Sequence, residues 1–196
     1  ISAQKVDLND GRVDINFDIK EGSLLVVKNI NFLGNKNFSD RELKSKISTK
    51  EDAWYKIFGS NKFIPERLEY DKEKLVDFYN QRGYMDFKVI SAKGDLLPNM
   101  SGFNINILVS EGLRYKVDKL KIISSSISES QKKLLIEQIF IKKSSFFDTR
   151  ALDESIKNIL KYFENEGFNF IQVIPKFKKN KDLISINFSV IEGRDK

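Results

Sequence analysis

Alternation of hydrophobic and polar residues marks three similar segments of the chain, at residues 15–22, 105–112 and 186–193. Each segment alternates Ile-Asn-Phe or Ile-Asn-Ile with polar positions and ends in Glu-Gly. A period of two residues predicts half-buried β-strands. Successive Glu-Gly pairs are roughly 80 to 90 residues apart, which is enough for a small domain and too long for one turn of a solenoid. The pattern therefore predicts an array of similar modules.

Between the first two Glu-Gly pairs the pattern predicts one complete module. Residues 26–32 alternate as a strand, and Ser39 begins a capping box (Ser-Asp-Arg-Glu) that predicts the start of a helix. A second helix is predicted over residues 65–82, because Pro stands at its start, apolar residues recur at helical spacing and Gly follows it. Two strands follow, over residues 84–93 and 102–110. The predicted order is βααββ.

The rest of the chain repeats this order, with a strand at residues 117–122 and a second capping box at Ser128. The landmarks of the second long helix correspond in order: Leu152, Ile159, Tyr162 and Phe163 match Leu68, Leu75, Phe78 and Tyr79. Residues 1–22 are predicted to be a β-hairpin, the end of a truncated preceding module. The domain prediction is thus a hairpin at residues 1–22 and modules at residues 23–112 and 113–196.

Two helices that connect strands of one small sheet must lie on one face of it, so the predicted fold is α+β, with a three-stranded mixed sheet in each module. A small open sheet leaves two strand edges, each a template for a further strand unless it is blocked. The expected core of the first module lies between the helices and the sheet. Its candidates are Ile30, Leu43, Ile47, Leu75, Phe78, Phe87, Val89, Ile105 and Ile107.

The composition excludes most enzyme chemistry. The 196 residues include no Cys and no His, which rules out thiol nucleophiles, imidazole bases, disulfides and ordinary zinc sites. Carboxylates are plentiful, but none lies in an apolar motif that would raise its pKa for glycosidase-type catalysis. We therefore predict no catalytic residue, no metal, no cofactor and no enzyme activity.

The net charge of +6 comes from interspersed Lys, Arg, Asp and Glu, which is typical of solvated helix faces. Attraction to an anionic membrane or to nucleic acid is the alternative interpretation. A βααβ order with a Lys-rich surface also describes KH domains. KH binding needs a Gly-x-x-Gly loop, which is absent from this sequence, so no nucleic-acid partner is predicted.

One spaced pattern resembles the POTRA domain of outer-membrane protein assembly factors. It is Leu68-x-x-Asp-x-x-x-Leu-x-x-Phe-Tyr-x-x-x-Gly-Tyr, preceded by Ile30-x-Phe-x-Gly-Asn and closed by Glu111-Gly112. The first complete module resembles the third POTRA domain of such factors, and the second resembles the fourth more loosely. POTRA domains also occur in secretion transporters, translocation assembly factors and division proteins, so these remain alternatives.

The resemblance implies a periplasmic scaffold, tethered to the outer membrane of a Gram-negative bacterium through a C-terminal β-barrel that this sequence lacks. It also implies three kinds of partner: assembly lipoproteins, unfolded outer-membrane proteins and the parent protein's own barrel. In POTRA folds the strand after the Gly-Tyr corner is a sheet edge that can pair with an incoming strand. Here that edge is predicted at Asp86, Phe87, Lys88, Val89, Ile90 and Ser91. An edge that merely faces water is the alternative.

Two further sets of candidate residues follow from the sequence. Trp54, Tyr55 and Phe58 form an aromatic loop, which is either a docking patch for a partner or a loop folded onto the helices. The pairs Glu21-Gly22 and Glu111-Gly112 are predicted to end strands at module junctions, where Glu21 and Glu111 are expected to set the angle between neighbouring modules. In the second module Pro175 lacks a backbone donor, so strand addition is expected to be weaker there.

Overall fold

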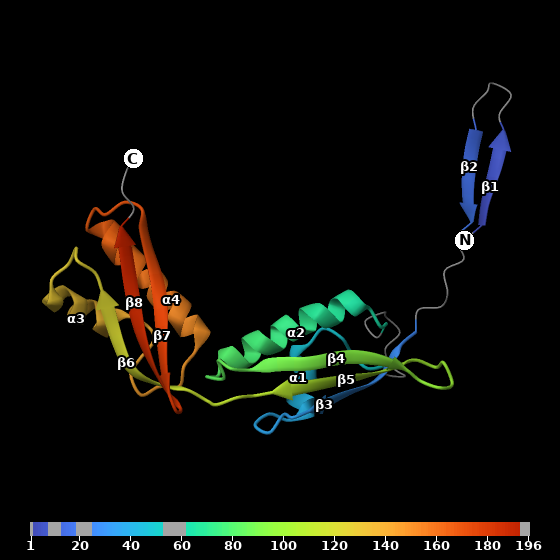
Figure 1. Cartoon of the computed structure of the whole chain (residues 1–196), viewed down its shortest axis with the longest axis horizontal. Coiled ribbons are helices and arrows are strands. Elements are labelled where there is room, and N and C mark those ends of the chain that lie inside the picture. The colour runs from blue at the N-terminus through green and yellow to red at the C-terminus, as the bar shows by residue number, and fades with distance from the viewer. Residues whose placement is uncertain (1, 8–12, 19–24, 53–61, 193–196) are drawn as a thin grey trace.

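The structure is a computed structural model, which describes residues 2–7, 13–18, 25–52 and 62–192. Its described part comprises a two-stranded hairpin and two α+β modules, each with a three-stranded sheet and two helices (Figure 1). The hairpin joins β1 (Ser2–Asp7) to β2 (Val13–Asp18) in antiparallel register. Val13, Ile15 and Phe17 are exposed on β2. The α+β prediction with two mixed sheets is confirmed.

The first module follows the predicted order, with β3 (Val27–Leu33), α1 (Asp40–Lys46), α2 (Pro65–Asn80), β4 (Lys88–Leu96) and β5 (Phe103–Ser110). The strand order is β3-β5-β4, so β5 is central, parallel to β3 and antiparallel to β4. Ser39 caps α1 by accepting a hydrogen bond from the Glu42 amide at 3.3 Å. Ser39 is therefore the N-cap of this helix, at the predicted position.

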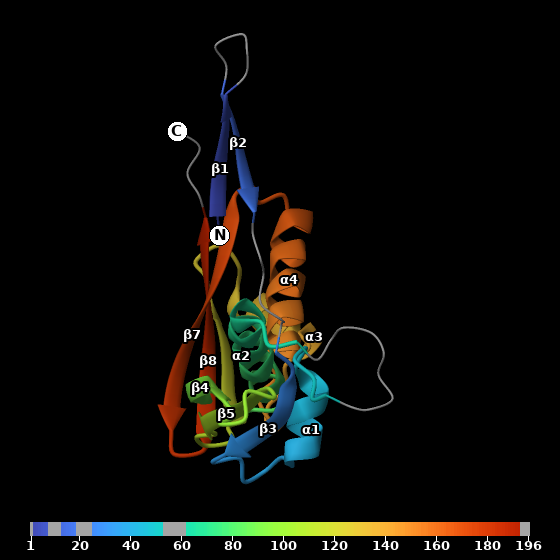
Figure 2. The ribbon, with the colours of Figure 1, turned by 90° about the vertical axis from the view of Figure 1, so that its right-hand side faces the viewer.

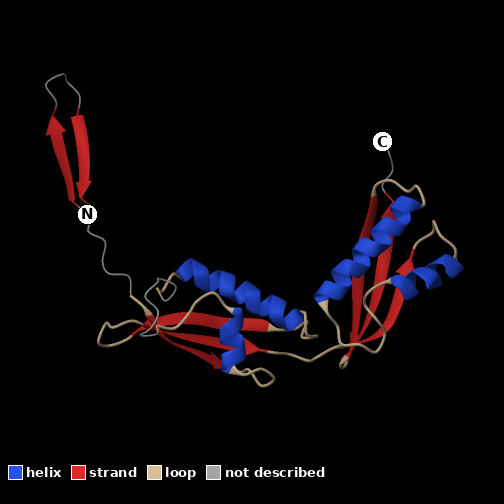
Figure 3. Cartoon of the chain, turned by 180° about the vertical axis from the view of Figure 1, so that it is seen from behind, coloured by secondary structure: helices blue, strands red, loops and turns tan. Residues whose placement is uncertain are grey.

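The second module repeats the topology with β6 (Lys116–Ile123), α3 (Glu129–Gln138), α4 (Thr149–Asn165), β7 (Ile171–Asn180) and β8 (Leu183–Glu192). Its strand order is β6-β8-β7, again with one parallel and one antiparallel pair. Figure 2 shows α3 and α4 on the same side of this sheet, and Figure 3 shows the two sheets as separate bodies of strands. Ser128 and Gln131 form the second predicted capping box.

Each module has its own hydrophobic core between helices and sheet. All predicted core residues of the first module lie in or against its cluster, and only Val89 is partly exposed. Such burial, at about 25 cal/mol per Å² of apolar surface, is the main stabilising contribution in a module of this size.

The strand predicted over residues 84–93 is displaced along the chain, since β4 spans Lys88–Leu96. The strand expected from Tyr84 begins only at Lys88, because residues 84–87 form a turn in which the Phe87 amide donates to the Tyr84 carbonyl at 3.1 Å. The Tyr84 ring is buried edge-to-face against Tyr79, and its amide donates to the Tyr79 carbonyl. Packing of these rings holds the chain to the helix end for four residues before the strand starts.

Candidate functional site

The open edge of the first sheet is β4, which pairs with β5 on one side and with no other strand of the described residues. The Leu97 amide donates to the Gly102 carbonyl at the end of this hairpin, so Leu97 and Gly102 form a hydrogen-bonded pair. In an antiparallel pair such positions alternate with positions whose backbone groups point away from the partner strand. Alternation from there points the backbone groups of Ala92, Gly94 and Leu96 outward. The register shift beyond Ser91 then leaves Val89 outward too. This edge is thus a row of backbone donors and acceptors without a strand partner.

A groove runs beside this edge between α2 and β4, with a volume of about 590 Å³. Val76 and Phe87 supply apolar surface, and charged side chains flank it. Its lining residues are Lys72, Glu73, Val76, Asp77, Phe87, Lys88 and Val89. An added strand would therefore find backbone partners at β4 and an apolar surface for alternate side chains beside it.

The predicted edge residues divide into two groups. Lys88, Val89, Ile90 and Ser91 lie in β4 and flank the bulge, with Ile90 57% exposed. Phe87 is instead a core residue, 5% exposed, and it stacks on Tyr79 with ring centroids 3.8 Å apart. Asp86 lies in the turn before β4. The predicted edge is therefore corrected to begin at Lys88, because the Tyr79 stack draws Phe87 into the core.

Asp86 belongs to the junction between the two modules. Its carboxylate accepts hydrogen bonds from the Tyr115 hydroxyl and from Lys179 Nζ, both in the second module. The Lys179 bond and then the Tyr115 bond hold the pKa of Asp86 below its ordinary value. The hydrogen bond between Tyr115 and Asp86, together with burial, raises the pKa of Tyr115 to about 12. Sequence reasoning missed this contact, since its members are far apart in the chain and match no motif.

Backbone contacts complete the junction. The Tyr115 amide donates to the Gly83 carbonyl at 2.8 Å, and Arg114 Nε donates to the Arg82 carbonyl at 2.9 Å. Gly112 has φ +70°, and a Cβ there would lie 2.9 Å from the Asp86 Cβ. Only glycine adopts this conformation without strain and leaves room for Asp86. Gly112 therefore lies at the junction, as predicted for the second Glu-Gly pair.

Glu111 lies within the first module rather than between modules. It is 6% exposed, and its carboxylate accepts hydrogen bonds from the Tyr79 hydroxyl at 2.8 Å and the Asn37 amide at 3.1 Å. Burial acts to raise the pKa of Glu111, but hydrogen bonds from Asn37 and Tyr79 outweigh it and hold that pKa below its ordinary value. The hydrogen bonds described for Glu111 all lie within the first module, so they do not support the prediction that Glu111 sets the angle between neighbouring modules. Glu21 and Gly22 lie outside the described residues.

The aromatic residues Trp54, Tyr55 and Phe58 also lie outside the described residues. The described residues that flank them close the opposite edge of the first sheet. The Asp52 amide donates to the Val27 carbonyl at 2.7 Å, and Glu51 Oε1 accepts from the Ile30 amide at 2.7 Å. The β3 edge is therefore occupied where the β4 edge is open.

In the second module the strand equivalent to β4 is β7, which contains Pro175. Its register with β8 continues through the proline without a shift, and the hairpin closes in a two-residue turn at Lys181 and Asp182. Counting from the Asn180–Leu183 pair that flanks the turn, Pro175–Phe188 is a non-hydrogen-bonded pair. The missing N–H of Pro175 therefore belongs to the open edge of β7.

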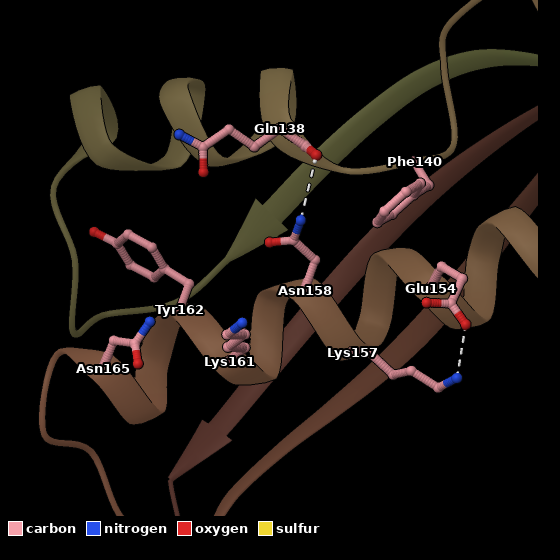
Figure 4. A pocket seen from close by; sticks show the side chains of 8 residues that line it. All are labelled: Gln138, Phe140, Glu154, Lys157, Asn158, Lys161, Tyr162 and Asn165. Atoms are coloured by element: carbon pink, nitrogen blue, oxygen red, sulfur yellow. Dashed lines mark hydrogen bonds and ion pairs between the residues drawn. The ribbon is translucent and has the colours of Figure 1, made fainter.

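A second hollow, of about 460 Å³, lies between the end of α3 and α4 (Figure 4). Asn158 Nδ2 donates to the Gln138 carbonyl across it, and Lys157 pairs with Glu154 at 2.7 Å. The polar groups thus bond to each other. Within the part of the chain that the structure describes, no group of three or more acidic side chains is arranged to hold a metal ion. None of the described helices is long and apolar enough to span a bilayer.

Comparison with known proteins places this arrangement in one family. The POTRA family, described as surface antigen variable number repeat, matches residues 25–112 and 115–193. The outer membrane protein assembly factor BamA of Neorickettsia risticii is 29% identical over 178 residues, which are 90% of this chain and 24% of that protein. BamA of Buchnera aphidicola is 27% identical over 193 residues, 97% of this chain and 31% of that protein. The chain thus spans about a quarter to a third of the length of these curated relatives.

Solved structures support the fold. Haemophilus influenzae BamA POTRA3-5 superposes with a TM-score of 0.66 at 22% identity, covering 87% of this chain and 67% of that one. BamA from Haemophilus ducreyi lacking POTRA domains 1-3 gives a TM-score of 0.63 at 17% identity, covering 86% of this chain and 29% of that one. At these identities the likeness concerns the fold alone.

Proposed function

Because the chain belongs to the POTRA family, we propose that it is a periplasmic scaffold segment of an outer-membrane protein assembly factor. The relatives that match nearly its whole length are named as such factors. We place it in the periplasm, tethered to the outer membrane of a Gram-negative bacterium by a C-terminal β-barrel. Its role is to hold partners and not to catalyse a reaction, in keeping with the absence of Cys and His.

The open edge of β4 is the observation that carries the binding part of the proposal. Outward backbone groups at Val89, Ala92 and Gly94 would pair with an extended client, and the groove at Phe87 would receive its apolar side chains. Backbone pairing is independent of side-chain identity, so one edge would serve many unfolded outer-membrane proteins. Assembly lipoproteins would bind the same scaffold. The predicted aromatic loop at Trp54, Tyr55 and Phe58 remains the proposed docking patch for them.

An amide-resolved NMR titration with an extended peptide copied from an outer-membrane β-strand tests this function. Chemical-shift changes are expected at residues 88–96 and along the facing side of α2, and small elsewhere. No change at millimolar peptide would mean that the first module does not receive clients by strand addition.

Substitution at Val89 tests the same edge genetically. Val89→Pro removes one outward N–H and is expected to weaken peptide binding at least tenfold, because a lost backbone hydrogen bond also disturbs its neighbours along the edge. Val89→Ala is the matched control, since it shortens the side chain and keeps the donor. If folded Val89→Pro binds as tightly as Val89→Ala, the edge model is wrong.

A further inference from the structure

The first strand of the first module has an edge that a carboxylate closes. The outward amide of Ile30 donates to Glu51 Oε1 at 2.7 Å, and Lys44 Nζ contacts the same oxygen at 2.8 Å. Next to it the Asp52 amide donates to the Val27 carbonyl at 2.7 Å. Groups of its own module thus occupy the edge of β3 at Val27 and Ile30, which blocks a further strand at these positions.

The second module keeps the neighbouring contact but not the carboxylate. The Ser144 amide donates to the Val117 carbonyl at 2.7 Å, repeating the contact of Asp52 with Val27. The residue before Ser144 is Lys143, so a cation stands where the first module has Glu51. Lys143 is exposed and has no carboxylate to offer an outward amide.

Leu120 of β6 is the counterpart of Ile30. Both residues follow a register shift in the parallel pair and lie opposite an isoleucine of the central strand, Ile30 opposite Ile105 and Leu120 opposite Ile186. Strand geometry couples the side-chain direction to the backbone direction, so Leu120 and the buried Ile122 turn their N–H groups outward, as Ile30 does. Among the described residues, no side chain accepts from the Leu120 amide.

The helix equivalent to α1 also differs. The buried residue of α1 is Leu43 and that of α3 is Leu135, so Ile136 occupies the place of Lys44. Together with Leu120 and Ile122 it lines a groove of about 380 Å³ between α3 and β6. In the second module Ile136 and Lys143 therefore stand in place of the Lys44–Glu51 ion pair, beside a groove lined by both apolar and charged side chains.

Charge around this edge is mainly positive. The groove includes Lys121, Lys132 and Lys133 against Glu129 and Glu137. Glu129 is already paired with Lys132 at 2.7 Å. The neighbouring Lys143 adds a further ammonium. Around the place that a carboxylate fills in the first module, lysines therefore outnumber glutamates, and one of the two glutamates is already paired.

We propose that the β6 edge, Leu120–Ile123, binds an extended acidic segment of a partner protein, whose carboxylate takes the position that Glu51 holds in the first module. The added strand would pair with the outward backbone groups of Leu120 and Ile122, and its apolar side chains would contact Ile136. This site is on a different module and a different strand from the proposed client edge at β4, and it does not depend on that function.

The test is an NMR titration of the whole chain with an eight-residue peptide that alternates Val and Thr and carries one central Glu. A matched peptide carries Gln at that position. The Glu peptide is expected to shift the amides of Leu120 and Ile122 and to bind at least fivefold more tightly than the Gln peptide. Equal affinity for the two peptides would overturn the carboxylate assignment, and shifts absent from β6 would overturn the site.

A charge-reversal variant gives a second arm. Lys143→Glu restores the carboxylate of the first module, so it is expected to cap the Leu120 amide, slow its hydrogen exchange and reduce binding of the Glu peptide at least tenfold. Lys161→Glu, on exposed α4, makes the same change of net charge and is expected to leave both readouts within twofold of the unmodified chain. Equal losses in the two variants would mean that net charge, and not the edge, governs binding. Shifts at β4 in the same titration report the client edge separately.

Discussion

Two buried carboxylates hold the first module together by binding backbone amides. Asp71, fully buried on α2, accepts from the Thr49 amide at 2.9 Å and from the Ser48 amide. In the second module Ser155 occupies this place and accepts from the Ile141 amide at 2.8 Å. The Ser155 hydroxyl accepts from one loop amide and donates to the Ala151 carbonyl, whereas the Asp71 carboxylate accepts from two loop amides. Asp71 and Ser155 thus occupy equivalent positions in the two modules, but they bind different numbers of loop amides.

Glu111 offers a stability prediction at this scale. Glu111→Gln removes the charge from a buried group that accepts from Tyr79 and Asn37, and it is expected to lower the free energy of unfolding by about 2 kcal/mol at pH 7. Because the folded-state pKa of Glu111 is lowered, its stabilisation is complete above the ordinary value of 4.5 and is lost as pH falls through the folded value. The difference between variant and unmodified chain should therefore shrink below pH 4.5.

Urea unfolding at pH 7 and at pH 3 measures both parts of this prediction. The control is Glu192→Gln, at the equivalent Glu-Gly pair of the second module, where the side chain is exposed. That variant should change stability by less than about 0.5 kcal/mol. A difference for Glu111→Gln that is unchanged at pH 3 would contradict the assigned charge state.

The edge strands of the two sheets differ in whether their outward backbone groups have hydrogen-bond partners. The β3 edge is closed by Glu51, whereas β4 and β6 leave outward amides free for a strand. On β7 the proline removes one outward donor without disturbing the pairing with β8. The two proposed binding edges therefore lie on different sides of their sheets: β4, which is antiparallel to the central strand, in the first module, and β6, which is parallel to it, in the second.

Restoring the donor on β7 should make the second module a better receptor. Pro175→Val returns an outward N–H at a half-buried position and supplies a side chain with high β-propensity. We expect the outer-membrane strand peptide to bind β7 several-fold more tightly, seen as new NMR shifts at residues 173–177. Ile174→Val is the control, since its backbone faces β8. No gain at β7 would mean that a missing donor is not what limits strand addition there.

At the scale of the whole molecule, two kinds of contact hold the junction between the modules. One is the backbone hydrogen bond from Tyr115 to Gly83, and the other is the solvent-exposed ion pair of Lys179 with Asp86. Lys179 and Asp86 are about 40% exposed at their side chains, so their pair contributes at most about 1 kcal/mol and is screened by salt. The Tyr115 ring is buried and anchors the same carboxylate. The pair therefore orients the modules more than it stabilises either of them.

Removing the lysine should loosen the junction without unfolding it. Lys179→Ala is expected to broaden the distribution of distances between spin labels on α2 and α4, most clearly at low salt, with a change in unfolding free energy below about 1 kcal/mol. Lys178→Ala is the matched control, because alternation along β7 points Lys178 to the other face. Double electron–electron resonance at two salt concentrations measures the effect. Equal distributions for the two variants would contradict an orienting role of Lys179.

The sequence by itself determined the elements and the repeat, because period-two strands, capping boxes and helical spacing are local and appear twice in the same order. It located the start of the β4 edge to within two residues, but the predicted edge ended at Ser91 whereas β4 continues to Leu96. Only the tertiary structure decided that Asp86 and Phe87 lie outside that edge, that Glu111 binds Asn37 and Tyr79, and that Lys143 replaces the closing carboxylate. These depend on contacts between residues far apart in the chain, and no local pattern encodes which distant partner a side chain or an open amide will meet.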